Sequence, residues 1–154
     1  MKLSAGILAY HKHPDIEVFL VHPGGPFFEK KDHGVWSIPK GEYIDEDPFE
    51  IAIKEFMEET GNILSKTMPF IALTEVRLKS GKKISAWAVE CDFEINFIQS
   101  NSFELEWPPK SGKTKLFPEV DKAGWFTLEQ GRLKLNPAQT DFVDQLEAIL
   151  KSRF

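Results

Sequence analysis

Residues 41–61, GEYIDEDPFEIAIKEFMEETG, place three carboxylates on little more than one turn of a predicted helix: Glu55, Glu58 and Glu59. Like charges four residues apart destabilise a helix by roughly 0.2 to 0.5 kcal/mol per pair, so this arrangement is unfavourable on a plain surface. A divalent cation between the carboxylates would turn the repulsion into attraction. The alternative interpretation is a solvated acidic face that holds only loosely bound counterions.

Capping residues mark both ends of this helix. Asp47 is a favourable N-cap, Glu50 completes a pattern like a capping box, and Gly61 is a C-terminal stop signal. The residues that recur at helical spacing and are expected to face a core are Phe49, Ala52, Ile53, Phe56, Met57 and Thr60. The acidic residues then point to another side. We therefore expect them to lie outward or to line a cleft.

A turn-rich segment, Trp36-Ser37-Ile38-Pro39-Lys40-Gly41-Glu42, leads into the helix, and Gly41 permits close approach of the backbone. The combined pattern resembles the Nudix box, the signature of enzymes that hydrolyse nucleoside diphosphates linked to another group X. The positions that carry this resemblance are Gly41, Glu46, Lys54, Glu55, Phe56, Glu58, Glu59 and Gly61. Most of the chain is similar to a bacterial group of Nudix pyrophosphohydrolases related to the diadenosine tetraphosphate hydrolases. The segments that carry this wider similarity are 4–6, 21–27, 36–42, 106–109 and 117–121.

Three positions depart from the family's box. The spacer between its first glycine and first glutamate is one residue short, which shortens the loop but leaves the helical glutamates in register. Lys54 stands where the family has arginine, and an ammonium lacks the planar two-point contact with which a guanidinium orients a carboxylate. Lys54 can still pair with Glu50 or Glu58 along the helix. Asn62 replaces an aliphatic residue at the helix end.

The resemblance implies a divalent metal site. Hard cations such as Mg²⁺ or Mn²⁺ prefer oxygen ligands. Glu55 and Glu59 can converge on one ion, while Glu58 can reach a second ion or hold a metal-bound water. The family geometry implies that the backbone carbonyl of Lys40, beside Gly41, completes the shell. Such cations neutralise polyphosphate oxygens and activate water for attack.

In this family a glutamate outside the box often supplies the general base or a further ligand, commonly about six residues before a tryptophan. Glu119 stands in that relation to a tryptophan here. We therefore assign catalytic roles to Glu119 and, within the box, to Glu58 and Lys54. The alternative for Glu119 is a solvated loop carboxylate. Glu104 and Glu106 are the other candidates for the base, although their alternation also fits a strand edge with outward acids.

The expected order of elements is strand, strand, helix, strands, helix. Strands are expected at 3–10, 16–22, 70–78, 83–93 and 124–126, the first four as two hairpins. A final helix is expected at Pro137–Lys151, with Asn136 as its cap. This is an α/β pattern. The resemblance implies the Nudix α/β/α sandwich, a mixed β-sheet between helices, with residues 1–154 as a single Nudix domain.

Length and composition fit one small globular domain, with 154 residues of which 42% are hydrophobic and 28% charged. No apolar run approaches the ~20 residues that span a bilayer and no signal-peptide pattern is present, so we expect a cytoplasmic enzyme without a membrane partner. The net charge of −5 argues against duplex nucleic acid. The single cysteine, Cys91, is expected to pack in the core. None of these features predicts the oligomeric state.

The expected substrate is a nucleotide, either a dinucleoside polyphosphate or a nucleoside triphosphate, including an oxidised one. The lysines considered for phosphate contact are Lys40, Lys110, Lys113 and Lys115, and the aromatic residues considered for base stacking or core packing are Phe27, Phe28, Trp36 and Trp107. The four histidines lack the spacing of a zinc site, and we assign none of them a catalytic role. The alternative function is a non-catalytic Nudix-fold module that binds a nucleotide without cleaving it.

Overall fold

The computed structural model describes residues 2–12, 14–93 and 100–153. A mixed sheet lies at its centre, with its main strands in the order β4-β6-β1-β2-β9 and with β3 attached to β1 and β5 to β6. β1 runs parallel to β6 and antiparallel to β2 and β3, so the first predicted hairpin is confirmed. The strands are β1 (Leu3–His11), β2 (Glu17–Pro23), β3 (Lys40–Tyr43), β4 (Ile71–Ala72), β5 (Val76–Arg77), β6 (Lys83–Glu90) and β9 (Val120–Thr127).

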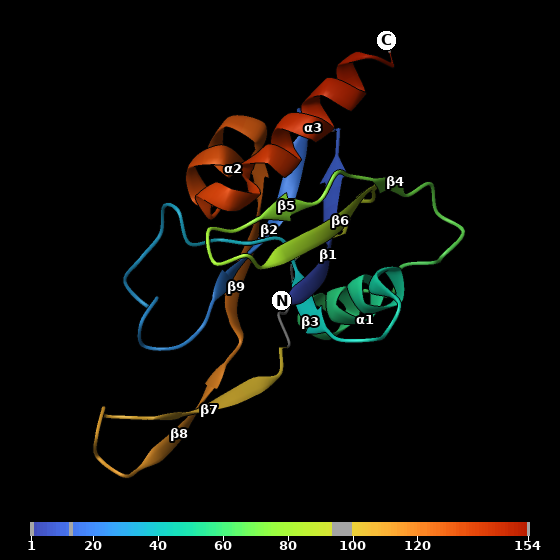
Figure 1. The fold of residues 1–154 in the computed structure, drawn as a ribbon. Helices are drawn as coiled ribbons and strands as arrows, with labels where there is room; N and C mark the ends of the chain where they lie inside the picture. The colour runs from blue at the N-terminus through green and yellow to red at the C-terminus, as the bar shows by residue number, and fades with distance from the viewer. Residues whose placement is uncertain (1, 13, 94–99, 154) are drawn as a thin grey trace.

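Helices cover both faces of this sheet (Figure 1). They are α1 (Pro48–Thr60), α2 (Leu128–Lys134) and α3 (Thr140–Lys151), the last preceded by a 3₁₀ turn at Pro137–Gln139. Alternate residues of β1 point to opposite sides: Ala5, Ile7 and Ala9 pack with α1, while Leu8 and Tyr10 pack with α3. Since both faces are covered, β1 and β2 are buried along most of their length. The predicted α/β/α sandwich is confirmed.

The caps of α1 are those that the sequence predicts. The side chain of Asp47 accepts a hydrogen bond from the backbone N–H of Glu50 at 3.1 Å. Gly61 adopts the left-handed conformation, with φ of 78°, that ends the helix. The expected capping box is wrong, because the Glu50 side chain pairs with Lys66 rather than with the N-cap backbone.

The buried stripe of α1 differs from the prediction at three positions, and the first is Ile51, which is buried although it was not expected to face the core. Phe56 is fully buried as expected, but Met57 is 39% exposed because it lies past the edge of the stripe that faces the sheet. Glu59 is buried, with 7% of its surface exposed. It stands three residues after Phe56 and therefore on nearly the same side of the helix. The acidic face is thus turned partly toward the protein interior.

The second predicted hairpin is interrupted. Residues 70–78 form two short strands, β4 and β5, which both pair with β6. Between them, Gln145 of α3 accepts a hydrogen bond from the N–H of Thr74 at 2.7 Å and donates one to its carbonyl at 3.0 Å. These contacts take up the backbone groups that a continuous strand would use for its ladder. The predicted strand at 124–126 is longer than expected, since β9 spans eight residues.

The sequence prediction lacks strand β3, helix α2 and the hairpin formed by β7 (Ser102–Glu106) and β8 (Thr114–Pro118). α2 begins with a capping box between Thr127 and Gln130. β7 and β8 form a separate antiparallel hairpin that projects away from the main sheet (Figure 1). We call this hairpin the arm. No helix among the described residues is long and apolar enough to cross a membrane.

The expected packing role of Cys91 agrees with its surroundings. Cys91 is partly buried against the apolar cluster beneath α1. Burial raises the pKa of its thiol to about 11. The thiol therefore stays protonated at neutral pH and is a poor nucleophile.

We predict that Phe56→Ala destabilises the fold by about 3–5 kcal/mol, because the phenylalanine fills the space between α1 and the sheet. Its ring lies 6.1 Å from that of Phe19 and 5.8 Å from that of Phe93. Urea unfolding measures the change. Met57→Ala, one residue along the same helix, is the control and should cost much less. Equal losses in the two variants would contradict this placement of the helix.

Candidate active site

The carboxylates of α1 lie where the helix packs against β1 and β3. β3 carries Lys40 and Gly41, which pair with Gly6 and Ala5 of β1. A Cβ atom at Gly41 would overlap the carboxyl group of Glu55. The close approach predicted for Gly41 is therefore real, and the group that approaches is a carboxylate.

Glu59 is the most deeply buried carboxylate of this group. Its Oε2 atom has no hydrogen-bond partner among the described residues. Burial, together with the nearby charge of Glu55, raises the pKa of Glu59 to about 9, although Lys40 opposes the shift. Glu55 is half-buried, and burial with the charges of Glu58 and Glu119 raises its pKa to about 6. These carboxylates repel one another and lack a counter-charge of sufficient size.

A cavity of about 140 Å³ lies beside Glu59, and we call it the acidic cavity. Lys40 and Glu119 line it together with Glu59. Burial lowers the pKa of the Lys40 ammonium, and Lys82 lowers it further. The acidic cavity therefore joins the glutamate helix, the strand before it and the loop at residue 119.

A second cavity of about 230 Å³ shares Pro23, Ser37 and Lys40 with the first, and we call it the neighbouring cavity. Its remaining wall combines apolar and polar residues. The apolar part consists of Phe28, Gly34, Val35, Leu78 and Ile84, and the polar part of Lys82, Asn136 and Gln139. A larger hollow of about 420 Å³ lies beside Glu42 and Tyr43. Because it is lined by none of the three helical glutamates, its size does not make it the better candidate.

Glu119 and the two alternative glutamates occupy different places. Glu119 stands at the junction of β8 and β9, where burial and the charge of Glu58 raise its pKa. Glu104 and Glu106 lie on the arm, and neither is among the described residues that line the acidic cavity. Glu106 accepts a hydrogen bond from the backbone N–H of Lys110 at 2.7 Å.

Lys54 and Glu58 form the ion pair that the helix spacing predicts. The Lys54 Nζ atom lies 3.9 Å from Glu58 Oε1, and the lysine side chain is 60% exposed. The other oxygen of Glu58, Oε2, accepts a hydrogen bond from the Asn101 side chain at 3.2 Å. Glu46 lies outside this group and accepts hydrogen bonds from the backbone N–H groups of Ile44 and Asp45, so it supports the loop before the helix.

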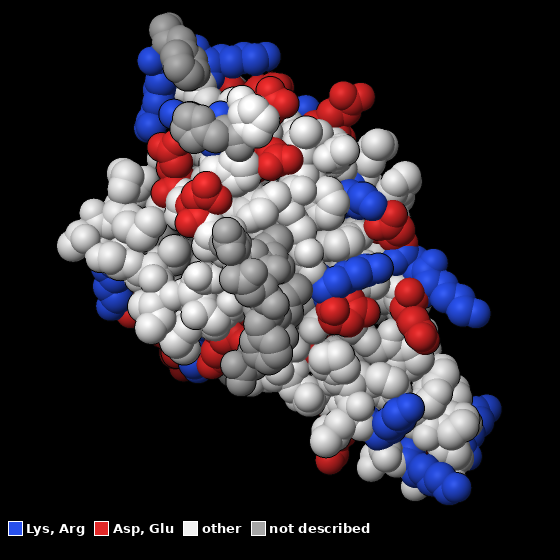
Figure 2. Space-filling view, turned by 180° about the vertical axis from the view of Figure 1, so that it is seen from behind, with Lys and Arg blue, Asp and Glu red and all other residues white. Residues whose placement is uncertain are grey.

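The aromatic residues considered for base stacking and the lysines considered for phosphate contact also lie in different places. Phe28 lines the neighbouring cavity, whereas Trp36 is buried in the core and is not free to stack a base. Phe27 packs edge-on against Trp107 of the arm with ring centres 5.7 Å apart. Lysines 110 and 113 lie in the connection between β7 and β8, and Figure 2 shows basic side chains at this end of the molecule. Neither lysine lines the acidic cavity.

A sequence model of the NUDIX domain matches residues 2–146. The chain belongs to the NUDIX family. It is a Nudix pyrophosphohydrolase. No curated protein sequence matches it.

Solved Nudix-like structures resemble this chain at low identity. A C. elegans Ap4A hydrolase in a binary complex has a TM-score of 0.66 at 20% identity over 97% of this chain and 98% of its own. The NUDIX domain of Shewanella oneidensis NrtR complexed with ADP ribose has a TM-score of 0.66 at 18% identity over 96% and 87%. A MutT protein from Methanosarcina mazei has a TM-score of 0.60 at 20% identity over 97% and 94%. At these identities the resemblance establishes the shared fold.

Nudix hydrolases generally use divalent cations, and the residues of this chain fit such an ion. Within the described ranges, no three acidic, histidine or cysteine side chains already form a closed ligand cage. The unpaired buried oxygen of Glu59 and the proximity of Glu55 and Glu58 are nevertheless the features that a cation would satisfy. All of these groups offer the hard oxygen atoms that Mg²⁺ and Mn²⁺ prefer.

Sequence reasoning missed two residues that shape this site. Gln139 is buried, accepts a hydrogen bond from the N–H of Ile38 at 3.0 Å and donates one to Ser37 at 3.0 Å, so that it fixes the segment before Lys40. Asn101 contacts Glu58 as described above. These contacts join residues 101 and 43 positions apart, and no local pattern in the sequence marks them.

We predict that Glu59→Gln stabilises the metal-free protein at pH 8 and abolishes stabilisation by Mn²⁺. Burial raises the folded-state pKa of Glu59 from 4.5 to about 9, so the folded protein holds a proton that the unfolded chain loses above pH 4.5. Wild-type stability should fall with rising pH across this window, and glutamine removes that loss. Thermal unfolding with chelator and then with Mn²⁺ measures both effects. Glu50→Gln, on the same helix, should change neither; a destabilised Glu59→Gln protein would argue against a buried, unpaired carboxylate.

Proposed function

We propose that this chain is a metal-dependent enzyme that hydrolyses a pyrophosphate bond in a nucleoside diphosphate linked to X, either a dinucleoside polyphosphate or a nucleoside triphosphate. The observation that carries the proposal is the pair of cavities joined at Lys40. One is lined by Glu59 and Glu119, and the other by Phe28 and amide side chains. A polyphosphate needs the first kind of surface, and a nucleoside needs the second.

Within this proposal, Glu55, Glu58 and Glu59 hold Mg²⁺ or Mn²⁺, with the Lys40 carbonyl as a further oxygen next to Gly41. The bound cation supplies neutralisation of the phosphate oxygens and activation of water. Glu119 takes the proton of the attacking water, whose oxygen bonds to phosphorus as the bridging P–O bond breaks. The raised pKa of Glu119 makes it a better base than an ordinary carboxylate. Lys54 holds Glu58 in place, and the Lys40 ammonium faces the phosphate chain.

We further propose that residues 1–154 act as a single Nudix domain on a small nucleotide in the cytoplasm rather than on duplex nucleic acid. The net charge of −5 supports this choice of partner. On the face shown in Figure 2, acidic and basic side chains are interspersed instead of forming a broad basic surface.

We predict phosphate or nucleotide release that requires Mg²⁺ or Mn²⁺ from a panel of diadenosine tetraphosphate, nucleoside triphosphates, nucleotide sugars and ADP-ribose. Products resolved by mass identify the bond cleaved. Glu59→Gln should lower the rate by orders of magnitude because it removes a charged ligand, and Glu50→Gln should not. Nucleotide binding without turnover would instead support the alternative function, a module that binds and does not cleave. Unchanged turnover in Glu59→Gln would refute the metal assignment.

We predict that Glu119→Gln lowers kcat by about 10²- to 10⁴-fold, the usual contribution of a general base. Glu104→Gln and Glu106→Gln are matched controls on the arm and should leave kcat near the wild-type value, because their carboxylates do not line the acidic cavity. Steady-state kinetics on the best substrate of the panel decides between them. A larger loss in either arm variant than in Glu119→Gln would transfer the role of base to that residue.

A further inference from the structure

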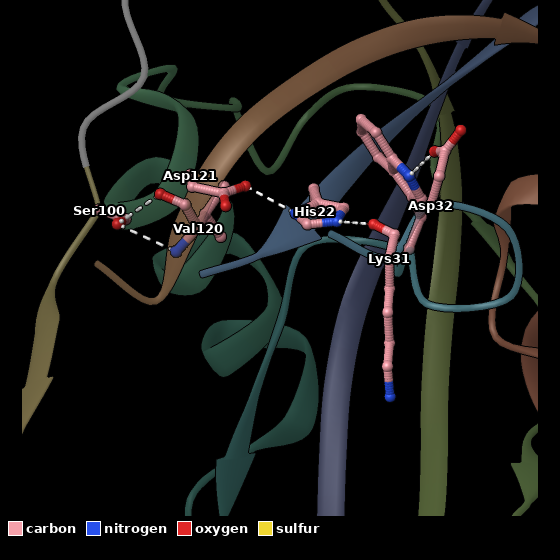
Figure 3. Close-up of polar contacts among 7 residues, drawn as sticks. His22, Lys31, Asp32, Ser100, Val120 and Asp121 are labelled. Carbon is pink, nitrogen blue, oxygen red and sulfur yellow. Dashed lines mark hydrogen bonds and ion pairs between the residues drawn. The ribbon is translucent and has the colours of Figure 1, made fainter. Parts of the chain in front are cut away.

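A fully buried histidine lies between the two segments that frame the cavities. His22, near the end of β2, has no exposed side-chain surface. Its Nδ1 atom lies 2.7 Å from Asp121 Oδ1, and its Nε2 atom lies 2.7 Å from the backbone carbonyl of Lys31 (Figure 3). One imidazole thus connects β9 with the loop that follows β2.

Both partners of this imidazole are hydrogen-bond acceptors. A backbone carbonyl accepts only, and so does an aspartate carboxylate. Neutral imidazole carries one N–H and can donate to one of them, whereas imidazolium donates to both. The two ring nitrogens of His22 therefore bridge the Asp121 carboxylate and the Lys31 carbonyl.

A β-bulge aims Asp121 at this histidine. β2 and β9 pair His22 with Lys122 and then Pro23 with Val120, which leaves Asp121 as the extra residue of β9. Such a residue breaks the alternation of the strand and can turn its side chain toward a chosen partner. The histidine–aspartate contact is thus built into the register of the sheet.

The same bulge adjoins Glu119. The N–H of Gly24 donates to the carbonyl of Glu119 at 2.9 Å, and a Cβ atom at Gly24 would overlap the carbonyl of Pro118. Ser100 holds the neighbouring Val120 through hydrogen bonds to its N–H and carbonyl at 3.2 and 3.1 Å (Figure 3). The backbone that carries Glu119 is therefore fixed on one side by Ser100 and on the other by the chain that leaves His22.

The second bond of His22 fixes the loop after β2. Lys31, whose carbonyl accepts this bond, lies three residues after Phe28, which lines the neighbouring cavity. The adjacent Asp32 accepts hydrogen bonds from the Trp36 indole N–H at 2.8 Å and from Lys134 at 2.6 Å. The Trp36 ring in turn packs edge-on against His22, with ring centres 5.2 Å apart.

We propose that His22 and Asp121 are a positioning pair. They fix the position of Glu119 relative to the loop after β2 that carries Phe28, which we call the Phe28 loop. Neither residue touches the reacting atoms in this assignment. The pair keeps a constant distance between Glu119, in the acidic cavity, and Phe28, in the wall of the neighbouring cavity. The kinetic part of the inference rests on the proposed function, whereas the structural part does not.

The test compares Asp121→Ala with Asp121→Asn. Alanine removes the contact, so the Phe28 loop and Glu119 should no longer be held by the same histidine. We expect kcat to fall by about 10- to 100-fold, as for other residues that orient catalytic groups, and KM to rise. The asparagine side-chain N–H can donate to Nδ1 while Nε2–H donates to the Lys31 carbonyl, so a ring with one proton keeps both hydrogen bonds. Asp121→Asn should therefore restore kcat and KM close to wild type.

A matched control lies at the other end of β2. His11 Nε2 of β1 is 3.0 Å from Glu17 Oε1 of β2, a second histidine–carboxylate pair between neighbouring strands. Glu17→Ala should leave kcat and KM unchanged even if it lowers the melting temperature. If Asp121 had only a structural role, Asp121→Ala would likewise lower the melting temperature without changing kcat or KM. Folded Asp121→Ala protein with wild-type kcat and KM would therefore overturn the proposal. Asp121→Asn as impaired as Asp121→Ala would overturn it as well.

Nuclear magnetic resonance provides a readout that does not need activity. Backbone amide signals of Glu119 and of residues 27–32 should shift together in Asp121→Ala and stay in place in Glu17→Ala. If the wild type cleaves no nucleotide, the proposed function fails while these shifts still test the pair; absence of coupled shifts would overturn the pair even in an active enzyme.

Discussion

The packing of α1 against β3 forces carboxylates into a place that apolar groups would normally occupy. Gly41 leaves the space in which the Glu55 carboxyl group lies, and the spacing of the helix puts Glu59 beside the buried Phe56. Burial of a carboxylate whose charge is only partly compensated is unfavourable, and the raised pKa values of Glu55 and Glu59 express that cost. The surrounding core tolerates it because apolar packing on both faces of the sheet stabilises the fold independently of these charges.

This cost and the proposed activity have the same origin. A site that already satisfied its carboxylates with lysine or backbone partners would have little to gain from a cation. Here the nearest base is Lys40, and burial with Lys82 lowers the pKa of its ammonium, so it offsets the acidic charge only in part. The residual negative charge is what makes a divalent ion favourable at this position. Under the proposed function, the protein would gain affinity for the metal at the cost of stability without it.

Much of the fold could be predicted because its signals are local. Asp47 and Gly61 mark the ends of α1 through interactions within a few residues, and the apolar runs of β1 and β2 reflect burial on both faces. The break between β4 and β5 could not be predicted, because it depends on Gln145 from a helix 71 positions away. The arm was missed for a related reason. β7 alternates regularly between exposed and partly buried residues, but β8 is exposed except at Phe117, so the sequence lacks the two matched apolar strands that indicate a hairpin.

The proximity of the helical glutamates could be predicted for the same reason. Glutamates one turn apart on a helix must lie near one another, whatever the rest of the chain does. The burial of Glu59 depends on how α1 rolls against the sheet, which the sequence pattern alone does not define. His22 and Asp121 illustrate the limit most clearly, because they meet across 99 residues through a bulge that no local pattern indicates.

The effect of Lys54 in place of the family's arginine depends on all the partners of Glu58. An arginine could bind both oxygens of a carboxylate through one planar group, and a lysine cannot. In this chain Lys54 lies 3.9 Å from Oε1 of Glu58, and Asn101 donates to Oε2 at 3.2 Å. Two single contacts from separate elements thus occupy the two oxygens that one guanidinium could bind. Because Asn101 leads into β7 and the chain returns through β8 to Glu119, the orientation of Glu58 is tied to the segment that carries the proposed base. The substitution therefore moves part of the orienting contact from the helix to the neighbouring loop.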